Sequence, residues 1–183
     1  MPKTSHAKPR RGVKRYCAVA ATRLHAAVGN LRRKIGTCTR DSRAYAAWAG
    51  KRLPHEWEWQ YAAQGKDHRD YPWGNEWVPA NAPAPDRGRI ELPPSNVQAH
   101  PSGASPFGVQ DLVGNVWQWT DEWTDQHTRA AILRGGSHYQ PTGSQWYFPQ
   151  AYKLSQHGKY LLMAPSLDRS ASIGFRCVMD AAQ

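Results

Sequence analysis

The sequence changes abruptly near residue 41, and this change limits what the chain can fold into. Residues 1–40 contain 11 Lys and Arg but no Asp or Glu, whereas residues 41–183 contain 13 basic and 14 acidic residues. The aromatic residues divide at the same place, because only Tyr16 of the 20 Trp, Tyr and Phe residues precedes residue 41. Aromatic side chains bury large areas and dominate protein cores. We therefore expect a core-forming domain at residues 41–183 and a basic tail, disordered or non-native, at residues 1–40.

The formal net charge of +10 consequently gives little reason to expect a specific nucleic-acid interface. A basic surface attracts polyanions, but the excess charge belongs to a tail that has no nucleic-acid-binding motif. No apolar run approaches the ~20 residues of a membrane-spanning helix, and the N-terminal region lacks the continuous apolar segment of a secretory signal. We expect no membrane span. The location stays open, with the cytoplasm as the default.

Local signals predict an α+β domain built from short elements. Residues 41–50 and 56–64 are expected helices, because Asp41 can cap the first and the glycines at positions 50 and 65 can end them in a left-handed conformation. Three apolar segments are expected strands: residues 116–120, 131–137 and 173–178. Between residues 71 and 108, eight prolines leave two alternatives, disordered chain or an irregular but packed region. The tryptophans at positions 73 and 77 favour packing.

Seven short segments follow one another along this domain: residues 46–54 (AAWAGKRLP), 56–63 (EWEWQYAA), 71–74 (YPWG), 107–109 (FGV), 114–120 (GNVWQWT), 133–137 (LRGGS) and 174–177 (GFRC). Together, and in this order, they resemble the formylglycine-generating enzyme, or sulfatase-modifying-factor, family. The resemblance implies a variant of the C-type-lectin-like fold for residues 41–183. It also implies that this region is the C-terminal portion of the family domain, without the strands that usually precede it.

The resemblance fails at the positions that carry the family's chemistry. In true formylglycine-generating enzymes two cysteines follow the Gly-Gly-Ser segment, bind copper and oxidise a substrate cysteine, and the matching positions here are Gln140 and Gln145. A carboxamide forms no thiolate and is not a soft ligand for Cu(I). We therefore expect neither copper nor copper-dependent cysteine oxidation, and assign no catalytic residue. Cys17, Cys38 and Cys177 form neither a disulfide framework nor a zinc-binding pattern.

The resemblance also implies a ligand groove with Ser137 at its floor. The segment that follows, residues 140–169, is rich in Trp, Tyr, Gln and Ser, which suits contact with a ligand. The partner is expected to be an unidentified protein or small molecule. The residues predicted to line the groove are Ser137, His138, Gln140, Gln145, Trp146 and Tyr147.

Calcium is the cofactor that the resemblance implies. One set of ligands would surround the Gly-Asn-Val-Trp turn, and since Gln118 stands where the family has Glu, we expect this site to be weak. A second, less well aligned set lies in the proline-rich region. The two sets are Asp111, Gly114, Val116 and Gln118 for the first, and Asn81, Ala82 and Asp86 for the second.

Two alternatives to a binding domain stay open. The chain is either a divergent oxygen-using metalloenzyme of the same superfamily, with ligands drawn from His138, His157 and Asp168, or a truncated gene product without independent function. A hydrolytic triad at Ser137-His138 is not expected, because no carboxylate is placed to orient the histidine. Arg134 and Arg176 are predicted to form structural ion pairs with carboxylates of the motifs.

Overall fold

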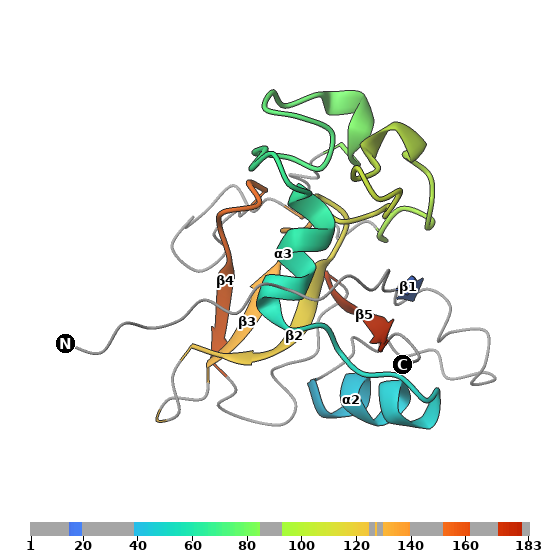
Figure 1. Ribbon diagram of the computed structural model, residues 1–183, viewed down its shortest axis with the longest axis vertical. Coiled ribbons are helices and arrows are strands. Elements are labelled where there is room, and N and C mark those ends of the chain that lie inside the picture. Colours follow the sequence, from blue (N-terminus) through green and yellow to red (C-terminus); the bar gives the residue numbers. More distant parts are fainter. Residues whose placement is uncertain are drawn as a thin grey trace.

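The computed structural model describes residues 15–19, 39–84, 93–124, 127, 130–139, 152–161 and 172–180. It has the predicted α+β architecture, with helices lying against a mixed sheet (Figure 1). The helices are α2 (Thr39–Trp48) and α3 (Glu56–Gln64), together with the short 3-10 helices η1 (Pro79–Asn81) and η2 (Pro101–Gly103). The strands are β1 (Arg15–Val19), β2 (Trp117–Trp123), β3 (Ala130–Arg134), β4 (Gly158–Leu161) and β5 (Ile173–Met179).

Local sequence signals set the ends of α3 but not the start of α2. His55 is the N-cap of α3, and its backbone N–H donates to the Glu58 carboxylate at 3.0 Å. Gly65, with a φ of 73°, follows the last turn, so α3 has the predicted bounds. Helix α2, which precedes α3 in the chain, begins at Thr39, two residues before its predicted start. Asp41 therefore lies in the first turn, where a carboxylate favours the positive end of the helix dipole.

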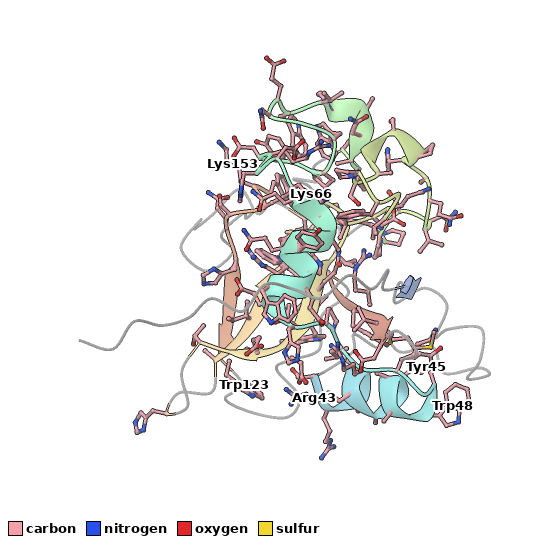
Figure 2. All side chains as sticks on the ribbon, in the orientation of Figure 1. Arg43, Tyr45, Trp48, Lys66, Trp123 and Lys153 are labelled. Atoms are coloured by element: carbon pink, nitrogen blue, oxygen red, sulfur yellow. The ribbon has the colours of Figure 1, made fainter. Side chains whose placement is uncertain are left out.

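The helix α2 packs on the sheet through one charged and two aromatic contacts. Arg43 pairs with Asp121 at 2.6 Å and lies over the Trp123 ring, 5.1 Å from its centroid (Figure 2). The Tyr45 ring meets the Phe175 ring of β5 edge-on, with centroids 5.6 Å apart. These contacts attach the helix to the neighbouring strands β2 and β5.

The five strands form one sheet in the order β1-β5-β2-β3-β4. All neighbours are antiparallel except β2 and β5, which are parallel. On the central strand, Gln118 lies opposite Gly174 of β5 on one side and Arg134 of β3 on the other. Helix α3 crosses in front of β2 and β3 (Figure 1). Gln118 is therefore at the middle of the sheet, beneath a helix.

The strand β1 lies within residues 1–40, the segment that we expect to be a basic tail. Arg15–Val19 pairs antiparallel with β5, and Cys17 lies opposite Cys177. Tyr, Cys and Val in this segment favour strand formation, and pairing satisfies the backbone groups that the outer edge of β5 would otherwise expose. No local signal predicted this strand, because its partner lies some 160 residues away along the chain. The short strand β4 also went unpredicted.

Two clusters of buried residues form the core. The first lies on the sheet and includes Trp117 and Trp119, which are 9% and 0% exposed, as expected for a core pair. The second lies between α3 and the loops around Leu112 and is centred on Trp59, 1% exposed.

The described part of the proline-rich region is irregular and packed. Rings of Trp73 and Trp77 lie 5.5 Å apart and pack against the second core cluster. A Cβ added to Gly103 of η2 would come 2.1 Å from the Asn81 carbonyl oxygen of η1, so the two short helices meet backbone to backbone. Within the described ranges, no helix combines the length and hydropathy needed to cross a membrane.

Candidate functional site

Ser137, predicted to lie at the floor of a groove, follows a two-glycine turn at the end of β3. Gly135 and Gly136 have φ values of 90° and 65°, a region that L side chains rarely adopt. A Cβ on Gly135 would lie 2.2 Å from the Leu112 carbonyl oxygen and 3.3 Å from the Trp59 ring. Only glycine therefore lets the chain turn beneath the loop that contains Leu112. We call residues 135–138 the Ser137 turn.

The Ser137 turn buries both of its predicted site residues. Ser137 is 2% and His138 4% exposed. His138 makes two hydrogen bonds to the backbone carbonyl oxygen of Asn115. One comes from its backbone N–H at 3.1 Å and the other from ring Nδ1 at 2.9 Å. A carbonyl only accepts, so Nδ1 carries a proton, and its hydrogen bond to the Asn115 backbone orients the imidazole. That Ser137 and His138 do not form a hydrolytic triad stays a prediction.

Asn115 joins the Ser137 turn to a distant loop. It is 2% exposed, and its side-chain amide bonds to both backbone groups of Ser95, accepting from N–H at 3.0 Å and donating to C=O at 3.2 Å. The sequence placed Asn115 in a motif but assigned it no role. Its carboxamide and carbonyl together fix His138 relative to the 93–100 loop.

An aromatic group lies beside the turn. The Tyr152 hydroxyl donates to the Ser137 carbonyl at 2.6 Å. The Tyr152 ring stacks on Trp77 with centroids 5.2 Å apart, and Trp77 meets Tyr71 and Trp73 edge-on. All four rings are half-buried. Tyr152 lies within the segment 140–169 in which ligand contacts are predicted, yet no motif pointed to it.

Arg134 hydrogen-bonds to the backbone of the segment that follows Tyr152. Its guanidinium, 1% exposed, donates to the carbonyl oxygens of Leu154 and Gln156 at 3.2 and 2.5 Å. It also bonds to the Gln60 side chain at 2.5 Å and pairs with Glu56 at 3.0 Å. Burial lowers the pKa of Arg134 below its ordinary value, and the charge of Glu56 partly opposes this shift. The predicted structural ion pair is confirmed for Arg134.

Arg176, 3% exposed, hydrogen-bonds to a neutral side chain and to two backbone carbonyls. It donates from Nε to the Gln118 side-chain oxygen at 2.5 Å and from Nη2 to the carbonyls of Gln110 and Asp111, both at 3.1 Å. The ion pair of Arg176 with a motif carboxylate stays a prediction. At position 118 the guanidinium meets a neutral Gln, which accepts a hydrogen bond without supplying charge.

The first predicted calcium set lies around the same turn, but its side chains do not offer a free ligand sphere. The Gln118 oxygen accepts from Arg176 and, at 2.8 Å, from the Trp59 indole N–H. The Asp111 carboxylate accepts from the Gln98 backbone N–H at 2.8 Å. Gly114 and Val116 belong to the same buried turn. A calcium ion needs six to eight oxygen ligands, and here the Gln118 oxygen already serves two buried donors.

Several of the predicted site residues lie outside the described residues. The second calcium set is described only at Asn81 and Ala82; Asp86 lies outside the described residues, as do Gln140, Gln145, Trp146, Tyr147 and Asp168. His157 is exposed, whereas His138 is buried. In the ranges that the structure covers, no three His, Cys, Asp or Glu side chains cluster closely enough to hold a metal.

The fold and the Ser137 turn define a domain of the C-type-lectin-like type, and comparison with known proteins gives its family. Residues 35–181 match the sulfatase-modifying factor enzyme 1-like domain, so the chain belongs to that family. It is 34% identical over 167 residues to the formylglycine-generating enzyme of Mus musculus, with 76% of this chain and 42% of the relative covered. It is 36% identical over 155 residues to the inactive C-alpha-formylglycine-generating enzyme 2 of Bos taurus, covering 77% and 48%.

The chain thus spans less than half the length of these two relatives. Among solved structures, PvdO from Pseudomonas aeruginosa matches with a TM-score of 0.59 at 23% identity. That match covers 79% of this chain and 60% of PvdO, and it shows the shared fold.

Proposed function

We propose that this chain is a ligand-binding member of the sulfatase-modifying-factor family that does not catalyse copper-dependent cysteine oxidation. The observation that carries the proposal is the placement of thiols. Gln140 and Gln145 stand where the family resemblance places the two reactive cysteines. The one cysteine in residues 41–183, Cys177, is 1% exposed within β5. A reactive thiolate needs a partly exposed, electropositive setting, which a sheet-core residue lacks.

The binding half of the proposal rests on the construction of the Ser137 turn. Buried Ser137 and His138 form a floor that is held by Asn115 and Tyr152 through hydrogen bonds. Half-buried aromatic rings lie next to this floor, and such rings with a few fixed polar groups are typical of ligand sites. One relative is itself named an inactive formylglycine-generating enzyme, which supports a role without the parent chemistry.

The catalytic half is tested with a peptide that carries a sulfatase-type cysteine. The purified protein is incubated with the peptide, copper and oxygen, and the product is followed by mass spectrometry. We expect no formylglycine above the level of a protein-free reaction. The double variant Gln140→Cys/Gln145→Cys is the matched control, because it introduces both thiols and leaves every residue of the Ser137 turn unchanged. Appreciable formylglycine from the unmodified protein would refute the proposal.

The binding half uses the same peptide and a form with Ser in place of its cysteine. Intrinsic Trp fluorescence reports on contact near the Ser137 turn, since Trp59 and Trp77 lie beside it. We expect a saturable change that is the same for both peptides, because no thiol chemistry is involved. A flat titration with both would remove a substrate-like peptide as the ligand class.

A further inference from the structure

The loop at residues 110–112 directs backbone oxygens toward two buried, donor-bearing side chains. Gln118 and Arg176 are each 3% exposed. The guanidinium of Arg176 donates to the carbonyls of Gln110 and Asp111, and the Gln118 NH₂ group donates to the carbonyls of Asp111 and Leu112 at 2.9 and 3.1 Å. The carbonyl oxygens of three consecutive residues are thus satisfied by positively polarised N–H groups.

The orientation of the Gln118 amide is fixed by its partners. Its oxygen accepts from Trp59 Nε1 and Arg176 Nε, and its nitrogen donates to two carbonyls, so all four hydrogen-bonding positions of the amide are used. A flipped amide would set two N–H donors against its NH₂ group and two carbonyls against its oxygen. Only one orientation therefore satisfies the site.

A carboxylate at position 118 would behave differently. One oxygen could still accept from Trp59 and Arg176, but the other would face the carbonyl oxygens of Asp111 and Leu112 at hydrogen-bond distance. Three oxygens without a donor between them repel one another in a buried site. A hard cation would relieve that repulsion, because calcium prefers carboxylate and carbonyl oxygens.

We propose that the Gln118 amide, supported by the Arg176 guanidinium, takes the place of a metal ion in this turn. The turn folds without calcium because NH₂ hydrogens occupy the space between oxygens that an ion would bridge. A single substitution, Gln118→Glu, creates a cation-dependent site. This inference is independent of what the Ser137 turn binds.

The experiment compares thermal unfolding of the unmodified protein, Gln118→Glu and Gln118→Met, each in EDTA and in millimolar calcium. We expect Gln118→Glu to lose about 5–10 °C in Tm in EDTA, the effect of leaving two carbonyls and a carboxylate oxygen without donors. Calcium should restore at least half of that loss. The matched control, Gln118→Met, has a similar side-chain length but no oxygen, so its loss should be the same in EDTA and in calcium.

The decisive quantity is the calcium response of each variant relative to the unmodified protein. Calcium bound elsewhere, for example near Asn81, would shift all three proteins equally and cancels in this difference. The proposal is overturned if Gln118→Glu responds to calcium no more than the unmodified protein does. It is also overturned if the unmodified protein is stabilised by calcium and Gln118→Met loses that response, since Gln118 would then be a ligand.

A second measurement covers the case in which Gln118→Glu does not fold. Terbium binds calcium sites and emits when excited through a nearby Trp, and Trp59 is bonded to Gln118. Equal terbium emission from the unmodified protein and from Gln118→Met supports the proposal. A saturable signal that Gln118→Met abolishes contradicts it.

Discussion

Replacement of Gly135 by alanine tests whether close backbone contact holds the Ser137 turn. A Cβ at this position would lie 2.2 Å from the Leu112 carbonyl oxygen, and backbone atoms cannot rotate away as a flexible side chain can. The same residue has a φ of 90°, and its carbonyl accepts the Gly114 N–H at 2.9 Å. Any relief of the clash must therefore move one or both of these loops.

The expected loss has two parts. A non-glycine residue at positive φ costs about 1–2 kcal/mol, and forcing an added methyl into packed surroundings costs about 1–3 kcal/mol more. Gly50 supplies a matched control: its φ is 64°, but a Cβ there meets no atom within 4 Å. Gly50→Ala should therefore lose only the conformational part, whereas Gly135→Ala should lose about 2–5 kcal/mol.

The assay is equilibrium unfolding in urea, with the free energy of unfolding extrapolated to water for both variants and the parent. The difference between the two variants isolates the contact between the Ser137 turn and Leu112. If Gly135→Ala and Gly50→Ala lose the same free energy within about 0.5 kcal/mol, the turn does not depend on this contact and the account of the floor is wrong.

Two further predictions concern charged side chains. Arg134→Met should lose about 2–4 kcal/mol of unfolding free energy, because it leaves the carbonyls of Leu154 and Gln156 without a donor. Arg134→Lys should recover only part of this loss, because one ammonium group cannot reach both the Gln60 and the Gln156 acceptors. The loss is measured by urea unfolding, and a neutral Arg134→Met would contradict this account of the Arg134 hydrogen bonds. The hydrogen bond from Arg69 holds the pKa of Asp67 below its ordinary value of 3.8, so stability from this pair is present above that value and fades as the pH falls through the lowered one. NMR titration of the Asp67 carboxyl should show its midpoint rise in Arg69→Gln, and an unchanged midpoint would exclude the pairing.

The parts of the fold that the sequence predicted are those set by local chemistry. Helix α3 begins after Pro54 and ends before Gly65, signals that act within a few residues. Strand β1 was missed because its stability comes from pairing with β5 across most of the chain, and no residue near it signals that partner. The buried Trp117 and Trp119 were predictable, since aromatic residues two apart on a strand share a face.

In the candidate site, the sequence indicated where the chain turns but not which residues hydrogen-bond. The glycine pair of the LRGGS segment predicted a break in the strand before Ser137, and Gly135 and Gly136 both have positive φ there. Asn115 and Tyr152, in contrast, act through hydrogen bonds to residues that are distant along the chain. Gln118 was expected to offer an oxygen to calcium, and only the positions of Trp59 and Arg176 reveal that this oxygen is already used.

These contacts link the two buried arginines through the Ser137 turn. Arg134 directly precedes Gly135, and it hydrogen-bonds to the segment on which Tyr152 lies. Arg176 and Gln118 hydrogen-bond to the 110–112 loop. The Leu112 carbonyl oxygen of this loop leaves no room for a Cβ at position 135. Each support is a set of hydrogen bonds from side-chain N–H groups to backbone carbonyls, and none requires a metal or a thiol. A family member with glutamines in place of the reactive cysteines can therefore keep a rigid floor, because the groups that shape the floor differ from those that perform the oxidation. The proposed loss of cysteine oxidation and the proposed binding role are compatible on this scaffold for that physical reason.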